Sequence, residues 1–174
     1  MKSICVSLIL IVLLLTNTSF KKIGVGKDAY YIVVDKSDYE MSVYDGDDNW
    51  IISYPVVFGN KDQGDKLYEG DRKTPEGTFH IIAKRPHAKW SRFMELDYPT
   101  PESIQKFNER KAQGLIPHNA KIGGAIGIHG TWPREDFAID LYDNWTAGCI
   151  STKNVYIQQL ANTVPVGTTV IIQK

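Results

Sequence analysis

The sequence predicts a mainly β domain with two helices. Most of the chain beyond residue 28 consists of short runs rich in β-branched and aromatic residues, separated by clusters of glycine, proline, asparagine and aspartate. Two later segments instead place apolar side chains at helical spacing. Strand-like runs occur near both ends of this region, so we expect early strands to pair with late ones.

Four runs in the first half predict strands because they are rich in β-branched and aromatic residues or alternate between apolar and polar ones. They are residues 30–35, 39–44, 50–58 and 77–83. The turn cluster at 45–49 (DGDDN) predicts that the second and third runs pair as a hairpin or meander. Residues 59–73 are polar and contain glycines, which predicts a long loop that is functional or mobile.

The second half predicts both helices. Residues 102–113 follow two prolines and place Ile104, Phe107 and Lys111 on one face, and Gly114 ends the helix. We expect this helix to serve packing rather than function. The other predicted elements are a short strand at 125–129, a strand or turn at 146–151, a helix at 155–163 and a closing strand at 168–173.

The N-terminus is organised like a secretory signal. Lys2 precedes the apolar run Ile4–Leu15, and small polar residues follow it. The run is shorter than the roughly 20 residues that span a bilayer. We therefore expect residues 1–20 to be a signal peptide, with an uncleaved anchor as the alternative. The mature protein is then exported and keeps no membrane span.

Charge and size narrow the class of protein. The chain has 20 Lys and Arg residues against 20 Asp and Glu residues, so it lacks the basic surface typical of nucleic-acid binding. We expect no nucleic acid as a partner, and the oligomeric state is left open. The mature chain is long enough to bury a core as one domain without disulfides.

A single cysteine is expected in the mature chain. Cys5 lies within the apolar N-terminal run, which leaves Cys149 alone. An unpaired thiol is a chemical liability in an oxidising compartment. A lone cysteine with a histidine elsewhere in the chain is a candidate nucleophile with its base. An intermolecular disulfide or an inert buried thiol are the alternatives.

Two short motifs contain the candidate base and the candidate nucleophile. The first motif is residues 129–130 (HG), and the second is residues 146–149 (TAGC). Sixteen residues lie between His129 and Thr146. This arrangement resembles the L,D-transpeptidase catalytic domain, the YkuD-like family of bacterial cell-wall enzymes. Residues 74–79 (TPEGTF) and 122–130 (IGGAIGIHG) are also similar to that family. The resemblance extends over residues 29–173 and assigns 28–174 to one catalytic domain.

The resemblance implies a fold and a reaction. The fold is a β-sandwich or barrel-like sheet with one or two packed helices. The implied enzyme acts in the periplasm or cell wall on peptidoglycan stem peptides, and no metal or cofactor is expected. Cys149 attacks the amide between an L-centre and a D-centre and forms a thioester, and the terminal D-alanine leaves. An amine of a second stem peptide, or water, then resolves the thioester.

Each motif residue has an expected role. His129 accepts the Cys149 proton and later gives it to the leaving amine. A hydroxyl or carbonyl group near Thr131 orients the imidazole, and backbone N–H groups around Gly148 and Cys149 stabilise the oxyanion. The residues predicted to bind the oxyanion or the substrate are Gly148, Thr146, Gly130 and Thr131.

Other residues near the motifs have two interpretations each. Three aromatic residues either wall a peptide groove or cap the core: Trp132, Tyr142 and Trp145. Lys73 and Arg134 either meet a substrate carboxylate or are solvated charges. His118 is a further candidate for the cleft, and a zinc site that combines it with His129 and Cys149 lacks any closely spaced ligand pair.

Two departures from the family pattern concern the fate of the thioester. Many members have histidine where this chain has Ala147, and arginine where it has Ser151. We expect a second polar contact and a guanidinium beside the nucleophile to be missing. Residues 64–77 resemble a branch of the family that hydrolyses stem-peptide links, so the alternative reaction is hydrolysis of L,D links in peptidoglycan or of links between peptidoglycan and protein. Hydrolysis, an inactive wall-binding module and an unrelated secreted cysteine protease therefore remain alternatives to transfer.

Overall fold

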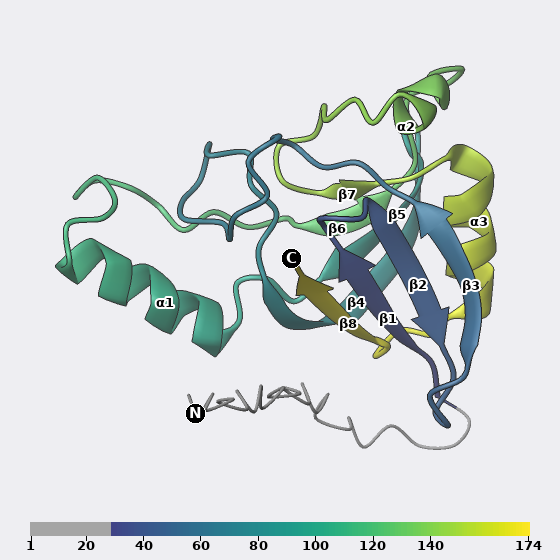
Figure 1. The fold of residues 1–174 in the computed structure, drawn as a ribbon, viewed down its shortest axis with the longest axis horizontal. Coiled ribbons are helices and arrows are strands. Elements are labelled where there is room, and N and C mark those ends of the chain that lie inside the picture. Colours follow the sequence, from purple (N-terminus) through teal and green to yellow (C-terminus); the bar gives the residue numbers. More distant parts are fainter. Residues whose placement is uncertain (1–28) are drawn as a thin grey trace, which may run out of the picture.

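A computed structural model describes residues 29–174 (Figure 1). The strands in this range are β1 (Tyr31–Asp35), β2 (Glu40–Tyr44), β3 (Trp50–Pro55), β4 (Gly77–His87), β5 (Ser91–Leu96), β6 (Gly127–His129), β7 (Ile150–Ser151) and β8 (Thr169–Gln173). The helices are α1 (Pro101–Ala112), α2 (Phe137–Asp140) and α3 (Asn154–Thr163). The predicted signal peptide, residues 1–20, lies outside the described residues.

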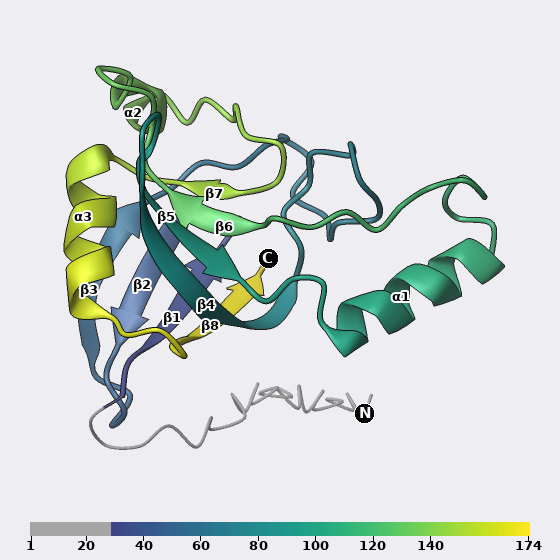
Figure 2. The same cartoon turned by 180° about the vertical axis from the view of Figure 1, so that it is seen from behind.

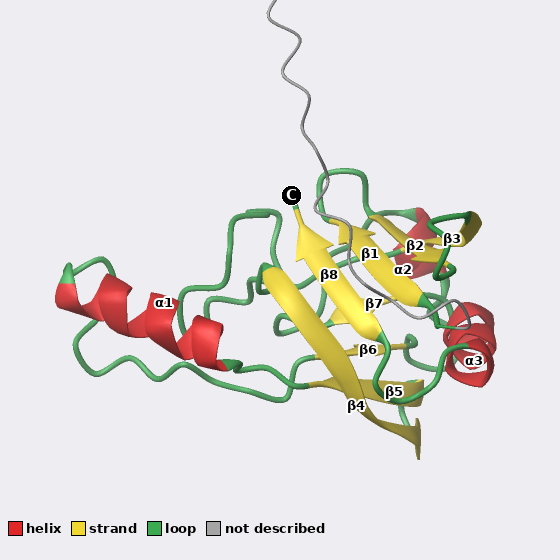
Figure 3. Ribbon diagram, turned by 90° about the horizontal axis from the view of Figure 1, so that it is seen from below, coloured by secondary structure: helices red, strands yellow, loops and turns green. Residues whose placement is uncertain are grey.

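All eight strands form one sheet in the order β3-β2-β1-β8-β4-β5-β6-β7. The early strand β1 pairs in parallel with the closing strand β8, which confirms the predicted pairing of distant strands. A bridge between Val57 and Ser151 then joins the chain just after β3 to the opposite edge of the sheet. The sheet therefore curls on itself, as the views from behind and below show (Figures 2 and 3). The mainly β, barrel-like prediction is confirmed.

Alternation along the strands builds the core. Ile32 and Val34 of β1 and Val170 and Ile172 of β8 point inward, and each has at most 2% of its surface exposed. Their strand neighbours point outward, as the period of two requires. Helix α3 packs against β5 and β6. It buries Ile157 and Leu160, and the predicted helix at 155–163 is confirmed within a residue.

Two elements were not predicted, and one is longer than predicted. Strand β5 lacks polar alternation because its neighbours Phe93 and Met94 are both buried, on opposite faces of the sheet. Helix α2 has only four residues, too few for a helical pattern to show. Strand β4 continues past Ala83 to His87, where it forms a long hairpin with β5.

Helix α1 confirms a predicted element but not its predicted role. Thr100 caps it by accepting a hydrogen bond from Ser103 N at 3.2 Å, and Pro101 occupies the first turn. None of its residues is buried, and Ile104 is 45% exposed. The helix stands beside the sheet rather than on it (Figures 1 and 3). An ion pair of 2.6 Å between Arg110 and Asp65 links it to the long loop.

Buried charges fix the loop between β3 and β4. Lys36, 1% exposed, pairs with Glu76 at 2.7 Å and donates to Gly64 O at 3.3 Å. Lys66 and Asp71 form a second pair at 2.8 Å, with side chains 3% and 5% exposed. Removing one partner of a buried pair is strongly destabilising because it leaves an uncompensated charge. These ion pairs anchor the loop against the domain.

Within residues 29–174, none of the helices is both long enough and apolar enough to cross a membrane.

Candidate active site

Two neighbouring strands bring the predicted nucleophile and base together. β6 and β7 run in parallel, with His129 opposite Ser151, and Cys149 directly precedes β7. Extending the β7 register back by one residue places Cys149 beside Gly127, two residues before His129 along β6 and on the same face of the sheet. A strand spacing of about 4.8 Å and a rise of about 3.3 Å per residue put the two Cα atoms about 8 Å apart. An imidazole and a thiol can meet across that separation.

Thr146 shapes the turn that presents Cys149. Its hydroxyl accepts a hydrogen bond from Gly148 N at 3.1 Å and donates to Cys149 O at 2.8 Å. Thr146 is 4% exposed, so its hydroxyl makes its hydrogen bonds within the protein rather than to solvent. The Gly148 amide, expected in the oxyanion hole, donates here to Thr146. The Cys149 N–H is the other amide that the sequence predicts for the oxyanion hole.

Glycine is required at 148 by both conformation and space. Gly148 has φ +128°, where L side chains are strained, and an added Cβ would lie 2.7 Å from Lys73 O. Arg72 Nε donates to Thr146 O at 3.2 Å from the same segment. The end of the long loop therefore lies against the turn at residues 146–149, which contains Cys149.

A backbone carbonyl orients His129. The imidazole Nδ1 lies 2.7 Å from Gly130 O, so Nδ1–H donates to that carbonyl and Nε2 is left as the basic nitrogen. Thr131, 1% exposed, donates to Asp136 Oδ1 at 2.5 Å, and Asn154 donates to the same carboxylate oxygen at 3.1 Å. This network fixes the chain beside Gly130. Thr131 thus supports the loop rather than facing the imidazole directly.

Burial sets the protonation of both groups. It lowers the pKa of His129 to about 4, although the hydrogen bond to Gly130 acts in the opposite direction. Burial also raises the pKa of the Cys149 thiol, which donates to Ala125 O at 3.5 Å. At neutral pH the resting pair is therefore a thiol and a neutral imidazole. If Cys149 is the nucleophile, as the sequence predicts, its proton would move to His129 during attack rather than before it, unlike in a preformed thiolate–imidazolium pair.

Burial of His129 also makes stability depend on pH. Its folded pKa is below the unfolded value of about 6.5, so the unfolded state binds more protons between pH 6.5 and about 4. We expect lowering the pH across that window to reduce the free energy of unfolding by about 3 kcal/mol through this residue. Urea unfolding at pH 7 and pH 4.5 tests this, with His129→Phe as the control.

The control separates His129 from the carboxylates, which lose their own stabilisation as the pH falls. His129→Phe keeps an aromatic ring but cannot titrate, so it should lose less stability than the wild type over the same interval. Equal losses in the two proteins would show that His129 is not held neutral by folding.

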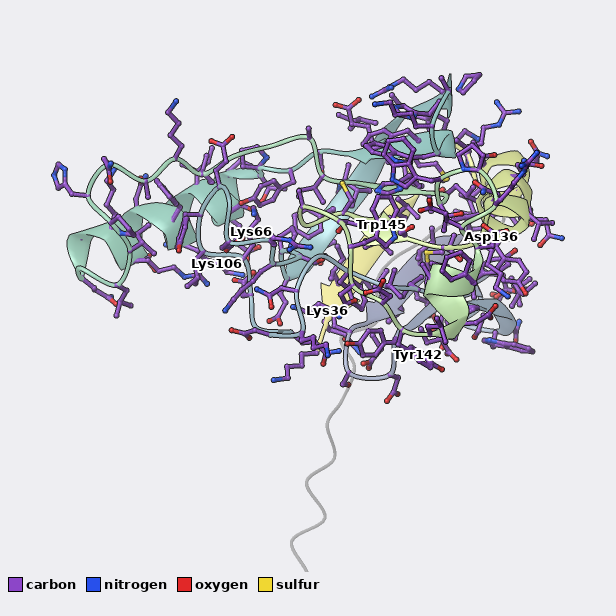
Figure 4. The ribbon with its side chains drawn as sticks, turned by 90° about the horizontal axis from the view of Figure 1, so that it is seen from above. Lys36, Lys66, Lys106, Asp136, Tyr142 and Trp145 are labelled. Carbon is purple, nitrogen blue, oxygen red and sulfur yellow. The ribbon has the colours of Figure 1, made fainter. Side chains whose placement is uncertain are left out.

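Aromatic rings surround His129. Trp90 stacks on it at 4.4 Å and Phe93 lies 6.0 Å away at 12°, and Trp145 meets it edge-on at 5.4 Å. Trp145 lies centrally, between Lys66 on the α1 side and Asp136 toward α3 (Figure 4). Sequence reasoning named Trp145 but missed Trp90 and Phe93. Both reach the site only through the β4–β5 hairpin, and no motif indicates them.

The other residues that the sequence suggested near the site differ in exposure and in their partners. Trp132 is 36% exposed, and Tyr142, 55% exposed, packs against Tyr39 at 5.3 Å. Lys73 forms an ion pair with Asp62 at 2.6 Å. Arg134 and His118 are exposed. Among residues 29–174, no three His, Cys, Asp or Glu side chains are grouped so that they could hold a metal ion.

Ser151, which stands where many family members have arginine, lies inside the protein. Its surface is 0% exposed, and its hydroxyl donates to Gly130 O at 3.3 Å, the carbonyl that also orients His129. An arginine would not fit at this position without displacing its neighbours. Ala147, in contrast, is exposed on the nucleophile turn.

Comparison with solved structures supports the fold. The Campylobacter jejuni helical cell shape determining protein Pgp2 is 23% identical with a TM-score of 0.63, over 86% of this chain and 49% of that one. Bdellovibrio bacteriovorus Bd1075 is 20% identical with a TM-score of 0.60, over 84% and 48%. An L,D-transpeptidase from Stackebrandtia nassauensis is 16% identical with a TM-score of 0.56, over 91% and 62%. The chain spans about half the length of the first two.

No curated protein sequence matches the chain. A family model does, and it is the one described as the L,D-transpeptidase catalytic domain, YkuD, over residues 29–172. The match includes both motifs and every strand except the last residue of β8. The chain therefore belongs to the L,D-transpeptidase catalytic domain family.

Proposed function

We propose that this protein is a cysteine-dependent L,D-transpeptidase that acts on the stem peptides of peptidoglycan. The observation that supports this most is that His129 ends β6 and that Cys149 directly precedes β7, the strand that pairs in parallel with β6. The imidazole Nδ1 is held by Gly130 O, which directs Nε2 away from that carbonyl. A nucleophile and an oriented base are the parts that acyl transfer through a thioester needs.

The first half-reaction releases an amine. As Cys149 Sγ attacks the carbonyl carbon of the L,D amide, His129 Nε2 takes the thiol proton. The carbonyl oxygen becomes an oxyanion, for which the Cys149 N–H is the proposed donor. The C–N bond then breaks, His129 gives its proton to the departing nitrogen, and D-alanine leaves. The acyl group stays on sulfur as a thioester.

The second half-reaction frees the enzyme. An amine of another stem peptide attacks the thioester carbon and His129 takes its proton. The C–S bond then breaks, and the proton passes to the departing Cys149 sulfur. Transfer gives a new amide and hydrolysis gives a carboxylate, according to whether an amine or water attacks. The thiol and the neutral imidazole are restored.

We further propose that the protein works outside the cytoplasm, in the periplasm or cell wall. The sequence of residues 1–20, with Lys2 ahead of the apolar run Ile4–Leu15, supports export. Peptidoglycan stem peptides are then within reach of the active site.

Ala147 favours a larger hydrolytic share than in relatives with histidine at this position. It is exposed on the nucleophile turn, so its methyl group offers an acceptor peptide no hydrogen bond. Positioning of the amine is what allows it to compete with water. We expect Ala147→His to raise the ratio of cross-linked to hydrolysed product several-fold, roughly the effect of one hydrogen bond.

The product ratio from a purified tetrapeptide muropeptide, measured by mass spectrometry, tests the Ala147 prediction. Ala147→Ser is the matched control, since it adds polarity without an imidazole. A ratio that is the same in all three proteins would show that this position does not determine the fate of the thioester.

The proposed function itself is tested by incubating the exported protein with purified muropeptides and analysing the products by mass. We expect loss of terminal D-alanine together with either cross-linked or hydrolysed product. Binding of the muropeptide with no product would identify an inactive wall-binding module. Digestion of casein without muropeptide turnover would identify a cysteine protease.

A further inference from the structure

The indole of Trp90 lies on the imidazole of His129. Trp90 is in the turn between β4 and β5, and its ring is 4.4 Å from the His129 ring with 22° between the planes. Trp90 also stacks with His87, at 4.3 Å and 10°. Phe93 lies opposite His129 in the β5–β6 ladder, with the two rings 12° from parallel. The hairpin thus includes His129 in a cluster of stacked rings.

The backbone holds this hairpin to the histidine motif. Trp90 O accepts a hydrogen bond from Gly130 N at 3.0 Å, and an added Cβ on Gly130 would lie 2.8 Å from the same oxygen. Trp90 N donates to His87 Nδ1 at 3.2 Å, which fixes the turn from within. Only a glycine at 130 allows the turn to come this close. The stack is therefore built into the fold and is not a contact of a freely rotating surface side chain.

Charged and titratable groups lie around the rings that surround His129. The Arg85 guanidinium lies 4.7 Å from the Phe93 ring centre, and Lys89 Nζ lies 5.0 Å from that of Trp132. His87, on β4, opposes protonation of His129 and so contributes to its lowered pKa. The carboxylate of Asp136 accepts hydrogen bonds from Thr131 and Asn154.

An imidazolium in this place would be attracted to the indole face by about 0.5–2 kcal/mol. It would lose its hydration, which for a buried group shifts a pKa by up to 3–5 units. Loss of hydration is the larger effect, and it accords with the lowered pKa of His129. The ring that excludes water from one face of the imidazole therefore favours its neutral form.

We propose that Trp90 is a positioning residue for His129, whose indole covers one face of the imidazole and holds Nδ1 on Gly130 O and Nε2 toward Cys149. The reaction that this serves rests on the function proposed above, but the ring arrangement does not. An oriented, neutral base accepts a thiol proton over a wider range of acidic pH than an exposed histidine does.

Two substitutions and a control separate stacking from simple packing. Trp90→Leu removes the aromatic face, and Trp90→Phe restores one. Trp132→Leu is the control, because Trp132 meets Trp90 edge-on at 6.4 Å and 87° and lies outside the face-to-face stack. The first measurement is the titration and tautomer of the His129 ring by NMR, in the mature protein without substrate.

We expect Trp90→Leu to raise the His129 pKa by about one unit or more toward its ordinary value and to mix the two ring tautomers. Trp90→Phe and Trp132→Leu should titrate within a few tenths of a unit of the wild type. A wild-type His129 that already titrates near 6.5 would overturn the inference without any variant, so the test does not depend on folding of Trp90→Leu.

The second measurement is the rate of Cys149 thioester formation against pH. The acid limb of Trp90→Leu should move upward by the same amount as the NMR titration, and its plateau should fall about tenfold. Trp90→Phe should restore both. A folded Trp90→Leu variant with an unchanged limb and titration would contradict the proposal. A shifted NMR titration in a protein that never forms a thioester would instead refute the function and leave this inference standing.

Discussion

Replacement of Cys149 by alanine is expected to abolish turnover of muropeptides while the protein stays folded. In the proposed mechanism the Cys149 thiol supplies the sulfur that carries the acyl group, and among residues 29–174 it is the only thiol that could form a thioester. Cys149 is half-buried, and changing a thiol to a methyl group leaves only a small void. Product analysis by mass spectrometry measures activity, and a thermal melt measures folding.

Cys149→Ser is the matched control for this prediction. Its hydroxyl preserves shape and hydrogen bonding to Ala125 O but is a much weaker nucleophile beside a neutral base. We expect both variants to be inactive and to melt within a few degrees of the wild type. Wild-type product levels from Cys149→Ala would end the cysteine mechanism.

Replacement of His129 is expected to slow thioester formation by about 10²–10⁴-fold, the usual contribution of general acid–base catalysis. In the wild type, the rate should fall at acidic pH only as His129 becomes protonated, near its lowered pKa of about 4. Stopped-flow or quenched assays of the acyl-enzyme across pH 4 to 9 measure both effects. A fall in rate with a midpoint near pH 6.5 would mean that the base is exposed to solvent.

Two variants are needed because His129 is 1% exposed. His129→Ala removes the base but also leaves a cavity under Trp90, whereas His129→Phe removes the base and keeps the stack. Similar losses in the two variants identify chemistry as the cause. His118→Ala is the negative control, since His118 is exposed beyond α1. A loss of rate in His118→Ala with normal rates in both His129 variants would show that the base has been misassigned.

Much of the fold was predictable because buried and less buried positions alternate along its strands. β1 and β8 carry inward-facing residues such as Ile32 and Val170 at every second position, and the turn 45–49 marks the hairpin between β2 and β3. Strand β5 escaped prediction because it is buried on both faces, so its pattern carries no period of two. Helix α1 was predicted in place but not in role. Its spacing resembles that of a packed helix, yet its apolar side chains remain partly exposed.

The candidate site, like the fold, could be predicted only in part. The positions of His129 and Cys149 follow from motif spacing, and their closeness follows from the pairing of β6 with β7. The aromatic cover could not be predicted, because Trp90 reaches His129 only when β5 pairs with β6. The neutral state of His129 depends on that cover. The burial of Ser151 could not be predicted for the same reason, since burial is a property of the folded chain.

The central claim is that a thioester forms on Cys149, and trapping it is the most direct test. The mature protein would be incubated with a tetrapeptide stem donor, quenched in acid, digested and mapped by mass spectrometry. We expect the acyl adduct on the peptide that contains Cys149, its loss on treatment with hydroxylamine, and its absence in Cys149→Ser. A carbapenem provides a second probe, and we expect it to acylate the same thiol. An adduct on any other residue, or turnover without an adduct in rapid-quench samples, would contradict the mechanism.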